Sequence, residues 1–177
     1  MVKEKYLTRY LQEWSADEIN QTATQIAQGA IKYGMLKIDT NKKIVFDMDE
    51  WLKIDGESGP FIQYSYARVN SLCEKLGYQK TKVDWTLLSH QTEKNLCQHL
   101  LNFNTVVLNC AETYRPSVLC TYLYELAKKF NVFYHECSIG QAETAELKHA
   151  RLSLSHAVGE TLKQGLALLG IPAPRRM

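Results

Sequence analysis

Several features of familiar protein classes are missing from this chain of 177 residues. No apolar run approaches the roughly 20 residues that a membrane-spanning helix needs. The start, Met1-Val2-Lys3-Glu4-Lys5, has no apolar signal-peptide segment behind it. We therefore expect a cytoplasmic protein with no membrane partner.

The formal net charge is only +2, whereas proteins that coat DNA nonspecifically are usually more basic. DNA is therefore not an expected partner, and local clusters of charge matter more than the total.

Disulfide and metal chemistry have little support in the sequence. The five cysteines are scattered, and no two of them form a C-x-x-C pair. An odd number at irregular spacing argues against a disulfide framework and against a zinc site. The run His135-Glu136-Cys137 contains residue types that bind metals, but adjacent residues on an extended segment point in different directions. We expect reduced thiols and no metal site.

Common catalytic motifs are also absent. The sequence contains no G-x-x-x-x-G-K-[S/T] and no G-x-G-x-x-G phosphate loop, and it contains no G-x-S-x-G nucleophile turn. Asp47-Met48-Asp49-Glu50 gathers carboxylates, but without convergent ligands it is typical of a solvated turn or a helix start. No residue is assigned a catalytic role, so a recognition module is a better interpretation than an autonomous enzyme.

The first third of the chain predicts one helix and an irregular connection. Ser15 and Glu18 form a capping box, and the apolar spacing that follows predicts a helix ending near Gly34. Residues 37–58 break this pattern, and Ile44-Val45-Phe46 is β-prone, so we expect a short strand or extended piece there. This segment suggests a boundary between residues 1–58 and residues 59–177.

From Pro60 onward the pattern is helical almost throughout. Helices are predicted from Pro60 to Gly77, over 87–100 and over 103–114, and Arg115-Pro116 forces a restart of a further helix that runs to Phe130. We expect a loop over 131–140 and a long last helix that stops at Gly170. The predicted fold is therefore all-α: a helical bundle with a short irregular or strand-containing N-terminal piece.

The most informative stretch is Gly59-Pro60-Phe61-Ile62-Gln63-Tyr64-Ser65-Tyr66-Ala67-Arg68. At about 100° per residue, an apolar stripe that includes Ile62 and Tyr66 faces the core. Phe61, Tyr64 and Arg68 fall on a second face, where flat rings and a guanidinium suit unstacked nucleobases and phosphate. The alternative is that Phe61 and Tyr64 pack on a neighbouring helix.

Four blocks of the chain, in order and spacing, resemble the C-terminal part of arginyl-tRNA synthetases, a family of class I aminoacyl-tRNA synthetases. The blocks lie within 29–33 (GAIKY), 46–68 (ending GPFIQYSYAR), 122–134 (YLYELA, FN and FY) and 150–177 (ARLSL, GL, LLGI and the terminal P, R and M). The resemblance covers nearly the whole chain. It implies an α-helical anticodon-binding domain at 59–177, preceded by a remnant that follows the catalytic domain.

The resemblance also implies what the chain lacks. The family's catalytic domain uses an H-I-G-H-like motif and a K-M-S-K-like loop with ATP, and neither motif occurs here. The chain is therefore expected to be inactive alone and to need no cofactor. The full-length ligase attaches arginine to tRNA(Arg) with ATP and magnesium, and we expect it to be a monomer.

The resemblance places anticodon-loop contacts at Phe61, Tyr64, Arg68, Tyr134 and Met177. The family usually has Tyr where this chain has Phe61, a change that keeps stacking and removes a phenolic hydrogen bond. It often has Glu where this chain has Arg175, which adds a positive charge near RNA.

Arg176 completes the set of tRNA-binding residues expected from the resemblance. For Met177 the alternative is an untethered tail. For the whole chain two other functions stay open, a protein-interaction bundle without RNA binding and an enzyme with an unrecognised site.

Overall fold

The computed structural model describes residues 1–177, with only the side chain of Arg9 outside the described part. Within these residues, the helices follow one another as α1 (Ala16–Leu36), α2 (Met48–Trp51), α3 (Gly59–Lys75), α4 (Gln91–Leu101), α5 (Phe103–Thr113), α6 (Pro116–Glu136) and α7 (Ala145–Leu168). A π-helical turn (Lys3–Leu7) and a 3₁₀ turn (Thr8–Tyr10) precede α1, and another 3₁₀ turn (Trp85–Leu87) precedes α4. The predicted all-α class is confirmed.

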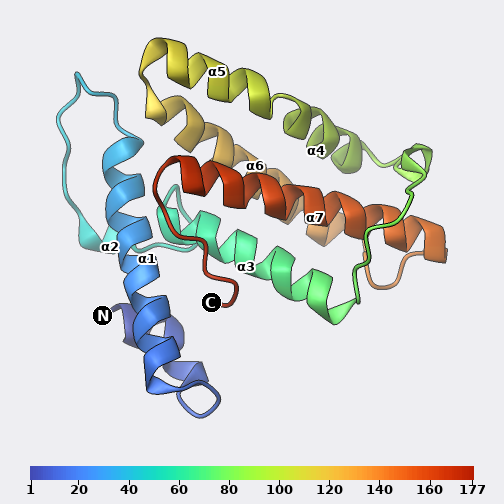
Figure 1. Cartoon of the computed structure of the whole chain (residues 1–177), viewed down its shortest axis with the longest axis horizontal. Helices are drawn as coiled ribbons and strands as arrows, with labels where there is room; N and C mark the ends of the chain where they lie inside the picture. The colour runs from blue at the N-terminus through green and yellow to red at the C-terminus, as the bar shows by residue number, and fades with distance from the viewer.

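The helices form a bundle in which α3 is covered on several sides. It packs against α1, α6 and α7, whereas α4 and α5 pack mainly on α6 (Figure 1). Fully buried side chains at the centre include Ile62, Leu123, Leu126, Phe130 and Leu162. Burial of each contributes about 1.5–3 kcal/mol through the hydrophobic effect. Because so many neighbours surround α3, only a narrow strip of it remains open to solvent.

A second, smaller core joins the two ends of the chain. Tyr6, Leu7 and Trp14 from the N-terminal segment pack with Ala67 of α3 and with Met177. In Figure 1 the segment after α7 runs back across α3 toward the N-terminal turns. The end of the chain is therefore anchored, and the alternative of an untethered tail at Met177 is wrong.

Local hydrogen bonds explain where the helices begin and end. The hydroxyl of Ser15 accepts from the backbone N–H of Glu18 at 3.2 Å, and the Glu18 carboxylate accepts from the N–H of Ser15 at 2.9 Å, so the predicted capping box is confirmed. Gly170 adopts a left-handed φ of 66°. The N–H of Ile171 then donates to the carbonyl of Leu166 at 2.9 Å, which closes the end of α7 as predicted.

The predicted loop over 131–140 is wrong in its first half. Helix α6 continues through Glu136, and the rings of Phe130 and Phe133 are both fully buried. Asn131 and Val132 are weak helix formers, but continuing the buried stripe through Phe133 and Cys137 outweighs their local preference. Tyr134 therefore lies on a helix and not in a loop.

Three smaller expectations also change. The segment Ile44–Phe46 has no regular secondary structure and forms no strand with any described residue. Helix α1 ends at Leu36, slightly beyond the predicted end near Gly34, and the missing side chain of Gly34 lets the ring of Trp51 pack closely against the helix. Leu87 ends a 3₁₀ turn, and α4 begins only after His90, whose side chain caps it. Asp47 caps α2, as expected for a helix start.

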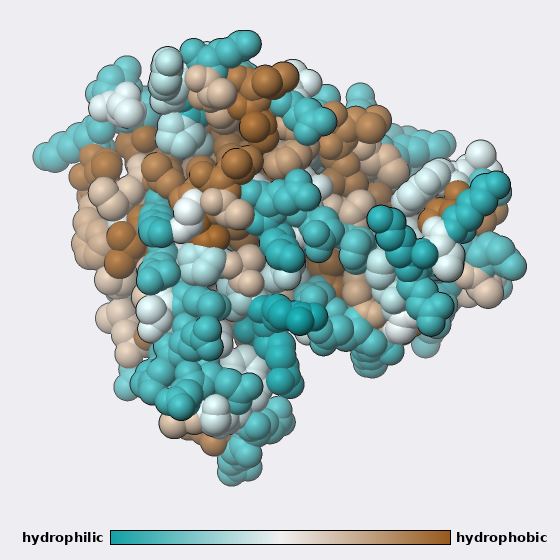
Figure 2. Space-filling view, in the orientation of Figure 1, coloured by the Kyte–Doolittle hydropathy of each residue, from teal (hydrophilic) through white to brown (hydrophobic). Residues whose placement is uncertain are grey.

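Figure 2 shows hydrophobic side chains gathered where the C-terminal half of α1, the loop after it and the end of α7 meet. Exposed apolar residues in these elements include Ile31, Met35, Phe46 and Leu168. None of the helices formed by the described residues is long and apolar enough to cross a membrane. The described residues also contain no group of three or more His, Cys, Asp or Glu side chains that could hold a metal ion.

Candidate nucleic-acid interface

The open strip of α3 carries Tyr64, Arg68, Ser71 and Lys75, which lie three or four residues apart and so share one face of the helix. The start of α3 fixes their direction. Pro60 lies in the first turn, and the Ser58 hydroxyl accepts from the backbone N–H of Phe61 at 3.1 Å. The same turn places Ile62 in the core, so the strip points away from it.

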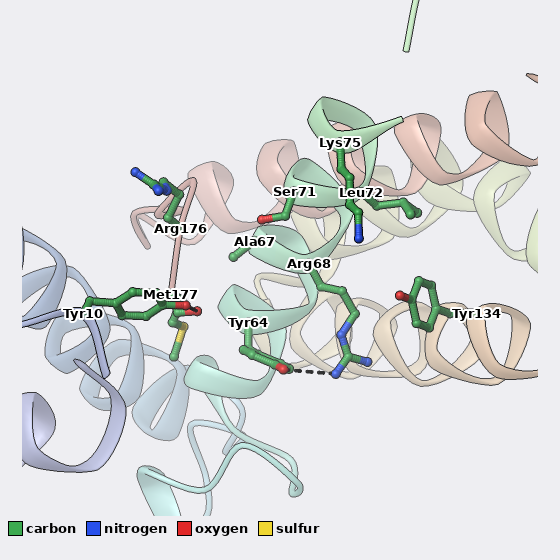
Figure 3. Close-up of a pocket in the computed structure, with 10 residues that line it drawn as sticks. All are labelled: Tyr10, Tyr64, Ala67, Arg68, Ser71, Leu72, Lys75, Tyr134, Arg176 and Met177. Carbon is green, nitrogen blue, oxygen red and sulfur yellow. Dashed lines mark hydrogen bonds between the residues drawn. The ribbon is translucent and has the colours of Figure 1, made fainter. Parts of the chain in front are cut away.

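Arg68 is held at the centre of this strip by α3 and α6 together (Figure 3). Its Nη1 donates to Oδ1 of Asn131 at 2.9 Å, and its Nη2 donates to the hydroxyl of Tyr64 at 3.1 Å. Its Cζ lies 4.8 Å from the ring centre of Tyr64 and 5.6 Å from that of Tyr134. Cation–π attraction and two hydrogen bonds therefore fix the guanidinium plane in advance of any ligand.

The opposite wall comes from both ends of the chain. The hydroxyl of Tyr10 donates to a backbone carboxylate oxygen of Met177 at 3.0 Å, and the buried Met177 side chain belongs to the smaller core. The Tyr10 ring stacks on Trp14 at 4.3 Å, and Cζ of Arg176 lies 5.3 Å from the Trp14 ring. An aromatic stack thus supports the segment that carries Arg176 and Met177.

These walls enclose a pocket of about 380 Å³. Figure 3 shows the ten residues that line it: Tyr10, Tyr64, Ala67, Arg68, Ser71, Leu72, Lys75, Tyr134, Arg176 and Met177. None of these ten has a carboxylate side chain, and the negative group among them is the backbone carboxylate of Met177, whereas Arg68, Lys75 and Arg176 bring positive charge. The pocket therefore combines tyrosine rings with cations, which suits bases and phosphates.

Two acidic side chains, Glu74 and Glu18, lie near the cations of the C-terminal segment and interact with them. Glu74 accepts from Nη2 of Arg175 at 3.2 Å. Hydrogen bonds from Ser15 lower the pKa of the Glu18 carboxyl, and the charge of Arg176 lowers it further. Glu18 is therefore ionised at neutral pH, where hydrogen bonds from Ser15 stabilise the carboxylate and Arg176 partly offsets its charge.

The structure brings together five of the six residues expected to bind RNA: Tyr64, Arg68, Tyr134, Arg176 and Met177. The expectation that Phe61 is available for contact is wrong. Its ring is buried and packs edge-on against Tyr124 of α6, with ring centres 5.5 Å apart. The alternative, packing on a neighbouring helix, therefore holds for Phe61, whereas Tyr64 is half-buried against the smaller core and also lines the pocket.

The sequence did not point to Tyr10 as part of the site. It lies before the first helix, in a 3₁₀ turn, and reaches the pocket through a contact that spans 167 residues. Lys75 shares the open face of α3 and could have been included from helical spacing alone. Nothing in the local sequence signals Tyr10 except that it and Trp14, four residues on, are both aromatic.

The fold and the pocket define an all-α recognition module with a basic and aromatic pocket. Residues 62–177 match the model of the DALR anticodon binding domain. The chain belongs to this family.

Similar proteins agree with this assignment. The arginine–tRNA ligase of Bdellovibrio bacteriovorus is 59% identical over 99% of this chain, and that of Streptomyces coelicolor is 37% identical over 91%. The solved arginyl-tRNA synthetase of Thermus thermophilus is 32% identical over 99% of the chain, with a TM-score of 0.89. The chain spans only 30%, 28% and 30% of these proteins, respectively.

Proposed function

We propose that this chain is the anticodon-binding, C-terminal part of an arginine–tRNA ligase and holds the anticodon loop of tRNA(Arg) in the pocket beside α3. One observation carries the proposal. The guanidinium of Arg68 is fixed over the rings of Tyr64 and Tyr134, in a pocket whose lining includes three cationic and no carboxylate side chains. The family assignment supports an anticodon loop as the ligand.

The chemistry of the pocket fits unpaired bases. A base that leaves the loop stack can lie against Tyr64 or Tyr134, and each such stack is worth about 1–3 kcal/mol. The fixed guanidinium of Arg68 can donate hydrogen bonds to a base edge or to a phosphate. Lys75 and Arg176 lie at the rim as exposed cations and would attract the backbone phosphates.

The ligase reaction is proposed to lie outside this chain. Neither an H-I-G-H-like nor a K-M-S-K-like motif occurs in its 177 residues, so they do not fit ATP and magnesium in the way the synthetase family binds them. We expect no arginine-dependent ATP–pyrophosphate exchange by this chain alone. Such exchange would contradict this part of the proposal.

Other features of the whole protein are proposed with it. We propose a cytoplasmic location and a monomeric full-length enzyme. We also propose 1–58 as a remnant that follows the catalytic domain and 59–177 as the anticodon-binding domain. The family match that begins at residue 62 supports this division.

The test is binding of a transcribed arginine tRNA to this chain, with and without anticodon substitutions, across a salt series. Tyr64→Ala and Tyr134→Ala should each weaken binding by about 5- to 150-fold, because each removes one stacking surface. Tyr114→Ala is the matched control, since Tyr114 is 86% exposed and does not line the pocket. Circular dichroism checks that every variant keeps its helices.

Three outcomes would contradict the proposal. An affinity that does not change when the anticodon is substituted would contradict base recognition. An equal loss of affinity in Tyr114→Ala would show that the pocket is not the binding site. A partner that survives nuclease treatment and competes with tRNA for the pocket would instead support a protein-interaction bundle.

A further inference from the structure

Gln63 directly precedes the pocket residue Tyr64 in the sequence but lies on the buried side of α3. Its side chain has no exposed surface, and it is not part of the pocket lining. An uncharged polar side chain in such a position must find hydrogen-bond partners inside the protein. The partners it finds connect parts of the molecule that are far apart in sequence.

One amide nitrogen joins three segments. Nε2 of Gln63 donates to the backbone carbonyl of Gln25 in α1 at 3.0 Å and to that of Pro172 at 2.7 Å. Pro172 lies just after Gly170, where the chain leaves α7 and turns toward the pocket. The amide therefore fixes the direction of the tail, which we define as residues 171–177, relative to α1 and α3.

The structure makes room for this amide at a cost. A Cβ atom on Gly29 would lie 2.4 Å from Oε1 of Gln63, so only glycine leaves the space. Oε1 itself is buried and has no hydrogen-bond partner among the described atoms. An unsatisfied buried oxygen lowers the free energy of unfolding. The amide of Gln63 is therefore not explained by a contribution to stability alone.

The far end of the tail forms the pocket wall. The amide of Asn70 donates to the carbonyl of Arg175 at 3.2 Å, and the hydroxyl of Tyr10 donates to a backbone carboxylate oxygen of Met177 at 3.0 Å. The bond from Gln63 to Pro172 is the inner anchor, and these two are the outer anchors. A change of direction at Pro172 would therefore move Arg176 and Met177 relative to Tyr64 and Arg68.

We propose that Gln63 is a positioning residue for RNA binding, which acts through the tail by setting where Arg176 and Met177 complete the pocket. The proposal rests on the proposed function of that pocket. It adds a residue that contacts no RNA in the proposed arrangement and that nevertheless controls the affinity. An apolar side chain of similar length would fill the same space and lose both hydrogen bonds.

The test compares the full chain with Gln63→Met, and with Gln63→Leu in case the first variant does not fold. Ser65→Ala is the matched control, because Ser65 is also fully buried in α3 but its hydroxyl donates to the Phe61 carbonyl of the same helix. Hydrogen exchange of the tail amides reports anchoring. Binding of the arginine tRNA reports function, and each variant is also made in a chain that lacks Met177.

In Gln63→Met the amide hydrogens of the tail should exchange faster than in the parent chain or in Ser65→Ala. The circular dichroism spectrum of the helices should stay unchanged. It should bind the tRNA about fivefold more weakly, because of the two lost hydrogen bonds only the one to Pro172 holds the tail. In the chain without Met177 the same substitution should weaken tRNA binding much less, because the pocket wall that Gln63 positions is already incomplete.

Unchanged tail exchange in Gln63→Met would overturn the proposal, and so would an equal loss of binding with and without Met177. If the parent chain shows no anticodon-dependent binding, the proposed function fails separately. Tail exchange then still decides whether Gln63 positions the tail.

Discussion

Arg68 is held by its geometry as much as by its charge. The guanidinium is planar and donates to both Tyr64 and Asn131, and a lysine ammonium reproduces neither the plane nor the pair of bonds. We predict that Arg68→Lys weakens tRNA binding by about tenfold, the loss of roughly 1.4 kcal/mol. Because the charge is kept, the slope of log affinity against log salt should hardly change.

The comparison with Arg68→Ala separates the two contributions. The alanine variant should bind still more weakly and show a shallower salt slope, since it also loses one cation. Titrations at several salt concentrations measure both quantities. If Arg68→Lys binds as tightly as the parent, the guanidinium plane has no special role.

Phe61 is expected to affect stability and not RNA contact. Its ring is 8% exposed and packs on Tyr124. Phe61→Ala should lower the free energy of unfolding by about 3–4 kcal/mol, the usual cost of removing a buried aromatic ring. Urea unfolding measures this loss. Tyr64→Ala, at a half-buried position, should cost clearly less in the same experiment.

Single residues show where prediction from sequence succeeds. Helical spacing and the family resemblance were enough to select Tyr64 and Arg68. Spacing failed at Phe61 because an angle around α3 does not reveal that α6 covers that side. Helical spacing could not predict the role of Tyr10, because that role depends on a contact with a residue 167 positions away in the sequence.

The crossing of α1 and α3 depends on two glycines. A Cβ atom on Gly59 would lie 2.1 Å from the backbone oxygen of Gly29, far closer than atoms can approach. We predict that Gly59→Ala destabilises the fold by at least about 2 kcal/mol, because the helices must move apart. Gly56→Ala is the control, since its nearest neighbour would be 3.6 Å away. Similar melting temperatures for the two variants would contradict this.

The contact between α4 and α6 should respond to pH. His99 stacks on Tyr122 with ring centres 4.4 Å apart, and its Nε2 lies 3.1 Å from the Tyr122 carbonyl. Burial lowers the pKa of His99 from its usual 6.5, although the hydrogen bond to Tyr122 partly opposes this. As the pH falls through 6.5, the unfolded chain takes up a proton that the folded one resists.

The free energy of unfolding should therefore be larger at about pH 7.5 than at about pH 5.5, where the contribution of His99 is being lost. His99→Gln should reduce this difference, because the substituted side chain does not titrate. Urea unfolding at both pH values measures it. An unchanged pH dependence in the variant would show that other groups are responsible.

Among the helices, starts and stops were easier to predict than continuity. Ser15, Glu18 and Gly170 act within one turn, so the sequence shows their effect directly. The continuation of α6 past Phe130 depends on a buried stripe that ends at Cys137 and packs against other helices. Local propensity does not contain that information, and Tyr134 was expected in a loop for this reason.

The charge of the whole molecule predicts how it should bind RNA. The net charge is only +2, so most of the electrostatic attraction must come from the cations at the pocket. Three such cations predict a slope of log affinity against log salt of about −2 for a single-stranded loop. Binding to duplex DNA of equal length should be much weaker. A far steeper slope, or equal affinity for DNA, would indicate nonspecific phosphate binding.

The pairing of Tyr10 with Met177 also has a consequence for the order of folding. A contact across 167 residues closes nearly the whole chain into a loop, and contacts of this kind form late because the loop entropy must first be overcome. Refolding should therefore restore helical circular dichroism before it restores the ability to bind RNA. The binding pocket would then be the last part of the molecule to mature.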